Sequence, residues 1–415
     1  MGGFGSAIAQ SHASMIELET AIDRILALVR CVGVERLRLA EAHGRYLSGT
    51  LISEVDLPAF DNSAMDGFAV RAGDVSQASR ENPVLLKLIG RVAAGETPAT
   101  PVSVGTCVRV FTGSPLPEGS DAVVMQEDTQ SEGQAKGCVA VLDCVRPWEN
   151  IRFRAEDVRL GGQVADAGDL VTPGKIALLA AVGFGEIMVG RQPVLGIIAT
   201  GSELCLAGEP LSPGQIYESN RFALAALSQR CGVKPRVYPI VPDNLVAIKA
   251  ALSIAIAECD VVVTAGGVSV GEFDFVKSAF AELGGELDFW RVAIKPGKPF
   301  AFGRCDGKLL FGLPGNPVSA FVTFLTLVRP ALLRMQGARD VDLPVRHGIL
   351  VEPLLNHGDR RHFVRVQIDS RGEVRSAGTQ ASHLLKSLSL ANGLVDLAPG
   401  AALSTGGPVR VGVWD

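Results

Sequence analysis

The stretch VVVTAGGVSVGEFDFVK, residues 261 to 277, decides the fold that the sequence predicts. A β-branched run stops at Gly266-Gly267, and two acids, Glu272 and Asp274, precede a segment that can be helical. Such a run is typical of a buried parallel strand, and ligands bind beyond the carboxyl ends of such strands. Paired glycines present backbone N–H groups to an anion, and carboxylates can hold a divalent cation beside it. The stretch therefore indicates a metal-assisted phosphate or oxyanion site, with a glycine-rich turn beside two solvated acids as the alternative.

The same alternation of strand and helix continues on both sides of this stretch. Strand-like segments such as VLGIIAT and RVYPIV alternate with helix-like segments such as RFALAALSQRCG and LVAIKAALSIAIAE. This rhythm predicts a doubly wound α/β domain, to which we assign residues 191–335.

The remainder of the chain predicts three further domains. Residues 15 to 53 have a helical pattern, with apolar residues at helix spacing from Ile16 to Val29. KIALLAAVGF predicts a short helix with Thr172 or its neighbour as N-cap and Gly183 at its end. Short strands separated by Gly and Pro recur elsewhere. The fold class is therefore multidomain α/β, and the α/β domain is joined by a mixed discontinuous N-terminal domain (15–55 and 148–190), a β-rich insert domain (56–147) and a C-terminal β domain (338–415).

Composition excludes several other classes of protein. The chain has 415 residues, too many for one ordinary core, and its net charge of −5 provides no general surface for nucleic acid. The eight cysteines include no C-x-x-C pair, as expected for scattered thiols in a reducing compartment. The N-terminus has no signal-peptide pattern, and no apolar run reaches the roughly 18 residues of a membrane span. We expect a cytoplasmic protein that binds neither membrane nor nucleic acid.

Charged residues follow several strands of the α/β domain, at the edge where ligands bind. Glu203, Asp243 and Asp274 each follow a strand, and Lys295 and Lys298 belong to the segment KPGKP. Carboxylates suit Mg²⁺ and lysines suit phosphate. The set favours a nucleotide-phosphate site with a metal, and solvated loops are the alternative.

At this point the chain resembles a known family, the molybdopterin molybdenumtransferases of molybdenum cofactor biosynthesis, which also include the E domain of gephyrin. The resemblance runs from about residue 16 to the end of the chain. It is carried by FDNSAMDGFAV (60–70), FTGSPLPEGSDAVVMQEDT (111–129), IRFRAEDV (151–158), GQIYESNR (214–221), GGVSVGEFDF (266–275), AIKPGKPFAFG (293–303) and GLPGNPVSA (312–320).

The resemblance implies a reaction. Adenylylated molybdopterin and molybdate would give molybdenum cofactor and AMP, with Mg²⁺ or a similar divalent cation. It also implies an elongated homodimer, whose linker is the discontinuous domain, and a molybdopterin adenylyltransferase as pathway partner. The alternatives are an adenylyltransferase, which the α/β domain alone permits, and a non-catalytic scaffold like gephyrin.

The residues and the resemblance together assign the site, and the roles of Asp66, Asp157, Thr112 and Ser382 are implied by the resemblance alone. The catalytic residues would be Asp66, Asp157, Glu203, Asp243, Asp274, Lys295 and Lys298, with Glu203, Asp243 and Asp274 as metal ligands. Substrate would bind Thr112, Arg152, Gly266, Gly267, Ser269, Gly271, Arg291, Pro314, Asn316 and Ser382. Arg291 stands where family members often have Lys, and Ser202 removes one acid from the family pattern. Neither change removes the proposed site.

Two of these residues also have a purely structural interpretation. Asn316 precedes Pro317, so it can cap a helix whose free N–H groups face the ligand edge. Asp66 can hold the turn in NSAMDG. Because no partner for Asp66 can be inferred within its own domain, we expect it to reach the ligand edge of the other subunit.

Overall fold

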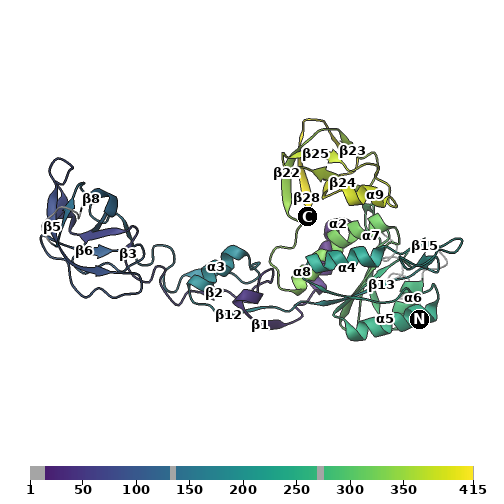
Figure 1. Ribbon diagram of the computed structural model, residues 1–415. Coiled ribbons are helices and arrows are strands. Elements are labelled where there is room, and N and C mark those ends of the chain that lie inside the picture. The colour runs from purple at the N-terminus through teal and green to yellow at the C-terminus, as the bar shows by residue number, and fades with distance from the viewer. Residues whose placement is uncertain (1–14, 131–136, 269–274, 415) are drawn as a thin grey trace, which may run out of the picture.

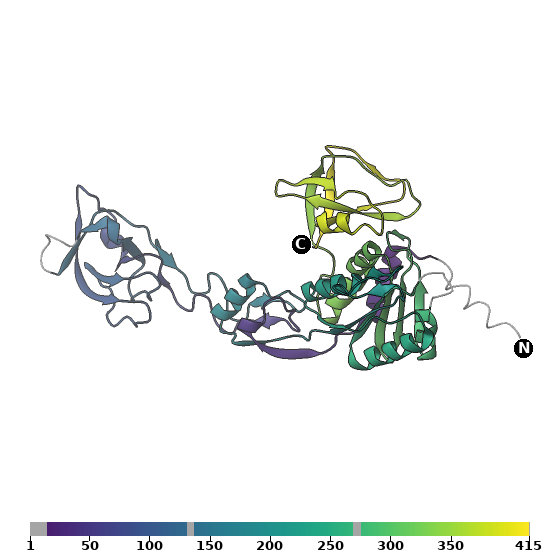
Figure 2. The same cartoon turned by 45° about the vertical axis from the view of Figure 1, so that its right-hand side comes forward.

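The computed structural model describes residues 15–130, 137–268 and 275–414. The molecule is elongated: the β-rich insert lies at one end, a narrow linker follows, and the α/β domain lies at the other end beside the C-terminal domain (Figures 1 and 2). The predicted multidomain α/β class is confirmed.

The α/β domain is built on a six-stranded sheet, whose first four strands run parallel while the fifth is antiparallel to its neighbours. The order across the sheet is β16 (Lys234–Val237), β13 (Val194–Ala199), β17 (Val261–Ala265), β21 (Lys308–Leu313), β20 (Ala301–Cys305) and β18 (Glu286–Trp290). The strand predicted at 261–265 is central and entirely buried, which explains its unbroken apolar run.

Helices cover both faces of this sheet (Figure 1). α4 (Asn220–Arg230) and a long helix, α7 (Pro317–Thr323), η4 (Phe324–Val328) and α8 (Arg329–Met335), pack in one apolar core. α5 (Leu245–Glu258) and α6 (Phe275–Glu282) pack in a second core on the other face. By length and composition, the continuous helix Pro317–Met335 could cross a membrane, but 78% of it is buried within the protein. Its apolar surface is therefore accounted for by the core.

The prediction of helical structure from residue 15 to 53 is wrong beyond Leu28. Helix α2 (Leu18–Leu28) ends where Val29 turns extended, and Gly33 follows with a φ of 119°. The chain then forms β1 (Val34–Arg38) and η1 (Leu39–Glu41). This outcome is decided by a partner strand far along the chain: β1 pairs with β12 (Glu186–Gly190), and no helical pattern in residues 15 to 53 reveals it. α2 itself packs into the core of the α/β domain through Leu18 and Ile25.

The linker is made by segments from both sides of the insert. Besides β1 and β12, β2 (Leu51–Ile52) pairs with β11 (Gln163–Ala165). The predicted short helix is α3 (Pro173–Ala181), and the Thr172 side chain accepts a hydrogen bond from Lys175 N (3.3 Å), as expected of an N-cap. Leu47, Leu179 and Val189 belong to a small apolar core of this region.

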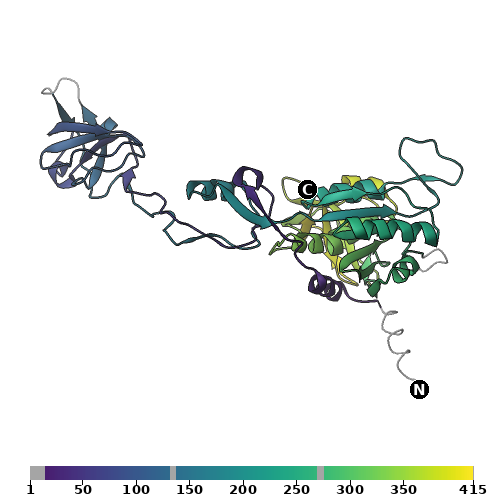
Figure 3. The same cartoon turned by 90° about the horizontal axis from the view of Figure 1, so that it is seen from below.

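The insert domain is a curved sheet with apolar clusters on both faces; Figure 3 shows it from below. Its strand order is β7 (Ala122–Met125), β4 (Gly67–Val70), β6 (Thr106–Val110), β5 (Val84–Val92), β9 (Cys138–Val141) and β8 (Thr129–Gln130). The short strands β3 (Asn62–Ser63) and β10 (Ile151–Arg152) pair at the junction with the linker, and η2 (Ala72–Val75) and η3 (Gln126–Asp128) complete the domain.

The C-terminal domain is a small closed barrel, because β26 pairs with both β24 and β28. The order is β24 (Arg361–Ile368), β25 (Glu373–Ser376), β22 (Val345–Leu350), β28 (Pro408–Val413) and β26 (Gly393–Leu397). The pair β23 (Leu354–Leu355) and β27 (Ala402–Leu403) and helix α9 (Leu385–Leu390) accompany it. A segment of the α/β domain, β19 (Ile294–Lys295), pairs with β24 and joins the two domains.

Candidate active site

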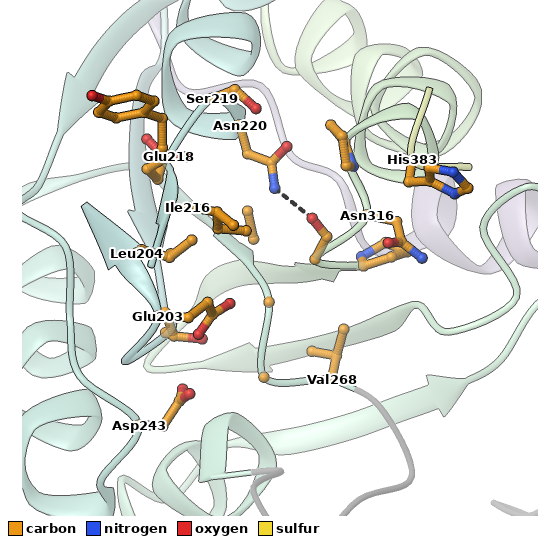
Figure 4. Close-up of a pocket in the computed structure, with 18 of the residues that line it drawn as sticks. Glu203, Leu204, Ile216, Glu218, Ser219, Asn220, Asp243, Val268, Asn316 and His383 are labelled. Carbon is orange, nitrogen blue, oxygen red and sulfur yellow. Dashed lines mark hydrogen bonds between the residues drawn. The ribbon is translucent and has the colours of Figure 1, made fainter. Parts of the chain in front are cut away.

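A cavity of about 760 Å³ lies at the carboxyl edge of the parallel strands, where the sequence predicts a ligand. Thr200 and Glu203 follow β13, Gly266 follows β17, and Pro314 follows β21; all four line the cavity. Two short parallel strands, β14 (Leu204–Cys205) and β15 (Ile216–Tyr217), form a further wall. Figure 4 shows this cavity with its side chains.

Two of the three predicted acids lie together at one side of the cavity (Figure 4). The loops of Glu203 and Asp243 are tied by Ser202, which donates from its N to Asp243 Oδ2 (3.2 Å) and accepts from Asp243 N at its Oγ (3.1 Å). Neither carboxylate forms an ion pair with another described residue. Apart from Asp243 Oδ2, which accepts from Ser202 N, their oxygens can therefore bind a cation.

The third predicted acid, Asp274, lies outside the described residues, as do Ser269 and Gly271. Within residues 15–130, 137–268 and 275–414, no group of three or more His, Cys, Asp or Glu side chains could hold a metal. The described part of the site thus offers the carboxylates of Glu203 and Asp243, which suits a hard cation that keeps several waters.

The two glycines after β17 have backbones that only glycine adopts easily. Gly266 and Gly267 have φ values of 97° and 68°. A Cβ on Gly266 would lie 2.6 Å from the carbonyl oxygen of Thr200, and one on Gly267 would lie 2.5 Å from Val276 Cγ2. However, Gly266 N donates to Leu313 O (3.0 Å) within the sheet. The expected donation from this N–H to an anion is therefore wrong, because the N–H already has an acceptor.

The loop before α7 places Asn316 at the cavity. Asn316 occupies the predicted N-cap position with Pro317 after it, but its side chain makes no capping hydrogen bond. Instead the side chain lies at the cavity with Pro314 (Figure 4). Capping alone does not explain this residue. The loop is fixed by Asn220, whose Nδ2 donates to Gly315 O (2.8 Å).

Several residues of the GQIYESNR segment line the cavity, although the sequence predictions assigned none of them individually. These are Ile216, Tyr217, Glu218, Ser219 and Asn220. Glu218 forms a buried ion pair with Arg221 (2.8 Å), so its charge serves the fold rather than the ligand. The length of the matching segment was the only sequence signal for this wall.

The predicted lysines lie beside the cavity and not in its lining. Lys295 and Lys298 are exposed, while Pro299 of the same segment reaches the cavity. Lys295 pairs in register with His362 of β24, a buried histidine. Burial first, and then the charge of Lys295, lowers the pKa of His362 to about 4. The C-terminal domain thus supports the segment that carries the lysines.

Arg291 has an unusual backbone and a stacked side chain. Its φ is 115°, which costs a non-glycine residue on the order of 1–3 kcal/mol. The guanidinium lies over the ring of Trp290, 4.3 Å from the centroid, and Trp290 Nε1 donates to Val268 O (3.2 Å). Arg291 therefore stands next to the glycine turn but outside the lining of the cavity.

Four predicted residues, Asp66, Thr112, Arg152 and Asp157, lie in or near the insert, at the opposite end of the molecule from the cavity (Figure 1). Asp66 accepts hydrogen bonds from Thr112 N (2.8 Å) and Thr112 Oγ1 (2.9 Å). The backbone bond from Thr112 is the largest cause that lowers the pKa of Asp66. The expectation that Asp66 has no partner in its own domain is wrong, since a turn far along the chain supplies one. Arg152 pairs with Asn62 at the base of the insert, and Asp157 lies in the segment leading back to the linker.

The C-terminal domain also reaches the cavity. Ser382 accepts a hydrogen bond from Val318 N through its carbonyl oxygen (3.2 Å), at the start of α7. The next residue, His383, lines the cavity together with Leu385. Sequence reasoning missed both residues, because nothing in the sequence places this loop against the α/β domain.

The fold and the site define a multidomain α/β protein with a ligand cavity at the carboxyl edge of its parallel sheet. Comparison with known families matches the MoeA N-terminal region (domain I and II) to residues 16–183, a probable molybdopterin binding domain to 196–334, and the MoeA C-terminal region (domain IV) to 348–414.

Individual relatives agree with these matches. The chain is 38% identical to molybdopterin molybdenumtransferase of Haemophilus influenzae, over 86% of this chain and 88% of the relative. It is 39% identical to molybdopterin molybdenumtransferase 2 of Mycobacterium tuberculosis, over 91% and 94%. The crystal structure of the molybdopterin biosynthesis moeA protein from Pyrococcus horikoshii superposes with a TM-score of 0.83 at 32% identity, covering 97% of this chain and all of that one. The chain belongs to the molybdopterin molybdenumtransferase (MoeA) family.

Proposed function

We propose that this protein inserts molybdate into adenylylated molybdopterin, releases AMP and so forms molybdenum cofactor. The observation that carries the proposal is the cavity at the sheet edge, with Glu203 and Asp243 on one side and the Asn316 loop on another. The family resemblance over all four domains supports the same reaction.

The chemistry requires charge neutralisation on a phosphate. Glu203 and Asp243, with Asp274 outside the described residues, would hold Mg²⁺ or a similar divalent cation, because free carboxylate oxygens are the donors it prefers. The bound cation would supply charge to the phosphate and its leaving oxygen. Molybdate is an oxyanion substrate, and the nearby cations Lys295, Lys298 and Arg291 favour its approach.

We also propose a homodimer in which the insert of one subunit meets the cavity of the other. Exposed apolar side chains lie near Asp66. Phe60 and Met65 precede it in the chain, and Trp148 and Phe153 contact each other in the segment whose Asn150 O accepts a hydrogen bond from Ala64 N. Others belong to the wall of the cavity: Ile216 and Tyr217 line it, and exposed Leu211 lies in the loop between β14 and β15. Two such patches at opposite ends of one long molecule can bury each other in a two-fold pair. Asp66, Thr112 and Arg152 would then complete the partner's site.

The direct test is AMP release from adenylylated molybdopterin with Mg²⁺, with and without molybdate. We expect molybdate-dependent release by the wild type and a loss of at least about 100-fold in Asp243→Asn, since removal of one preorganised charged group typically costs this much. The control is Asp306→Asn, in the tight turn between β20 and β21 and outside the cavity lining. A folded wild type that consumes ATP instead would be an adenylyltransferase, and one that does neither would be a scaffold.

The cellular context follows from the same proposal. A cofactor-synthesis enzyme of this kind would act in the cytoplasm as a soluble protein. A molybdopterin adenylyltransferase would supply its substrate, because the adenylylated pterin must be made before it can be consumed. Neither a membrane nor a nucleic acid has a part in this reaction.

A further inference from the structure

One wall of the cavity comes from the C-terminal domain. His383 and Leu385 line the cavity, and His383 lies on the side away from Glu203 and Asp243 (Figure 4). The hydrogen bond from Val318 N to Ser382 O (3.2 Å) holds this loop against the start of α7. The cavity is therefore an interdomain site.

The loop that carries His383 is fixed from inside the C-terminal barrel. Arg365 of β24 is fully buried, and its Nη2 donates to Thr379 O (2.9 Å) and Ala381 O (3.2 Å). Its Nε donates to Ser387 Oγ (3.2 Å), beyond the loop in α9. Gln380 accepts from Arg365 N through Oε1 (2.9 Å). The chain is thus anchored on both sides of His383, through the backbone before it and the Ser387 side chain after it, which lowers the ordering cost of binding.

The polar side chains at this end of the cavity remain available. Among residues 15–130, 137–268 and 275–414, neither Asn316 nor His383 has a side-chain hydrogen-bond partner. Asn220, in contrast, is engaged with Gly315 O (2.8 Å). An amide presents donors and an acceptor, and an imidazole has two ring nitrogens that can take part in hydrogen bonds. That pattern matches the edge of a nitrogen heterocycle, while Leu385 and Pro317 offer apolar surface to its face.

The distribution of charge in the cavity decides which end of the ligand lies beside Asn316 and His383. A phosphate cannot lie beside Glu203 and Asp243 without a cation, but those carboxylates can hold one and so fix the phosphate end. The other end of the cavity carries an amide and an imidazole in place of carboxylates, and both suit a ring. A ligand that contains both phosphate and heterocycle therefore has one favoured orientation.

We propose that His383, together with Asn316, binds the heterocycle of the adenylylated ligand, so that the C-terminal domain is a recognition element of the site. This inference rests on the proposed function, because adenylylated molybdopterin supplies the heterocycle. The ring is either its adenine or its pterin, which share this edge chemistry.

Calorimetric binding of two probes, AMP and 6-hydroxymethylpterin, tests the proposal on the full-length protein. We expect His383→Ala to weaken binding of one probe about tenfold, the usual effect of one hydrogen bond, and His383→Gln to restore most of it. The probe that is affected identifies the ring. His347→Ala is the matched control, because His347 is an exposed histidine of β22 outside the cavity lining. In turnover, His383→Ala should raise KM more than it lowers kcat.

Three results would overturn the proposal: binding of both probes by His383→Ala as tightly as by the wild type, failure of the wild type to bind either probe, or equal weakening by His347→Ala. Thermal melting of each variant separates loss of contact from loss of fold. A wild type that binds a probe through His383 but releases no AMP from adenylylated molybdopterin would refute the proposed function and leave this inference standing. Molybdate-dependent AMP release by the wild type, together with unchanged probe binding in His383→Ala, would support the proposed function and refute the role of His383.

Discussion

At the scale of single residues, the glycine turn after β17 is the least replaceable part of the described site. Gly266 combines a φ of 97° with a space for Cβ that is already filled by the Thr200 carbonyl oxygen at 2.6 Å. The turn brings the chain across the end of the sheet, so its shape sets the floor of the cavity. Its sequence signal was the pair of glycines, although the N–H of Gly266 is used by Leu313.

We therefore predict that Gly266→Ala destabilises the protein. Left-handed backbone alone costs on the order of 1–3 kcal/mol, and the contact with Thr200 adds to it. Urea unfolding monitored by circular dichroism would measure the loss. Gly174→Ala is the control, since Gly174 lies in α3 with nothing within 4 Å of its Cβ position and no positive φ. Equal midpoints for Gly266→Ala and wild type would contradict the argument.

At the scale of elements, strand β24 connects the site to the C-terminal barrel. It pairs with β19 of the α/β domain, and Arg360 Nη1 donates to Ile294 O (3.0 Å) across the same junction. His362 lies buried at this junction with its Nε2 lacking a partner among the described residues. A neutral imidazole is tolerated there, but a charged one is not.

The pH dependence of stability should report this junction. Burial lowers the pKa of His362 from 6.5 to about 4, so the folded state binds fewer protons than the unfolded state between these values. Protonation of His362 therefore lowers the free energy of unfolding. The protein has its full stability from this group above pH 6.5, and it loses up to roughly 3 kcal/mol as the pH falls toward 4. Urea unfolding at pH 7 and pH 5 should show a smaller difference for His362→Gln than for wild type. The exposed His347→Gln variant should retain the wild-type difference in stability between pH 7 and pH 5. If His362→Gln shows the same difference as the wild type, His362 is not the source of the pH dependence.

At the scale of the whole molecule, the two groups of site residues lie at opposite ends of the chain. Asp66 and Thr112 are bonded to each other in the insert, while Glu203 and Asp243 line the cavity beyond the linker (Figures 1 and 2). One chain cannot bring them together without abandoning this shape. Two chains can, if the insert of each meets the cavity of the other.

Mixed dimers provide a decisive measurement. Asp66→Asn and Glu203→Gln should each abolish AMP release alone, because each site would lack one group. Co-refolded in equal amounts, they should recover about a quarter of wild-type activity, since half the dimers are mixed and each mixed dimer has one intact site. Asp66→Asn mixed with Asp66→Asn is the control. No recovery in dimers shown to be mixed would place Asp66 outside the partner's site.

The sequence by itself determined the elements and much of the chemistry. The β-branched run at 261–265, the Thr172 cap and the repeated strand–helix rhythm are local signals, because burial and capping act within a few residues. The acids after the strands were predictable for the same reason, because the sequence alone shows where a strand ends. The long matching motifs made the family identifiable.

Only the tertiary structure decided which surfaces meet. It made residues 34–38 a strand through a partner at 186–190, paired Thr112 with Asp66, and moved Lys295 out of the lining by pairing it with β24. It also brought His383 to the cavity. Each of these depends on contacts between segments far apart in the chain, and such contacts leave no periodicity in the sequence because their energy comes from a neighbour that the local pattern does not contain.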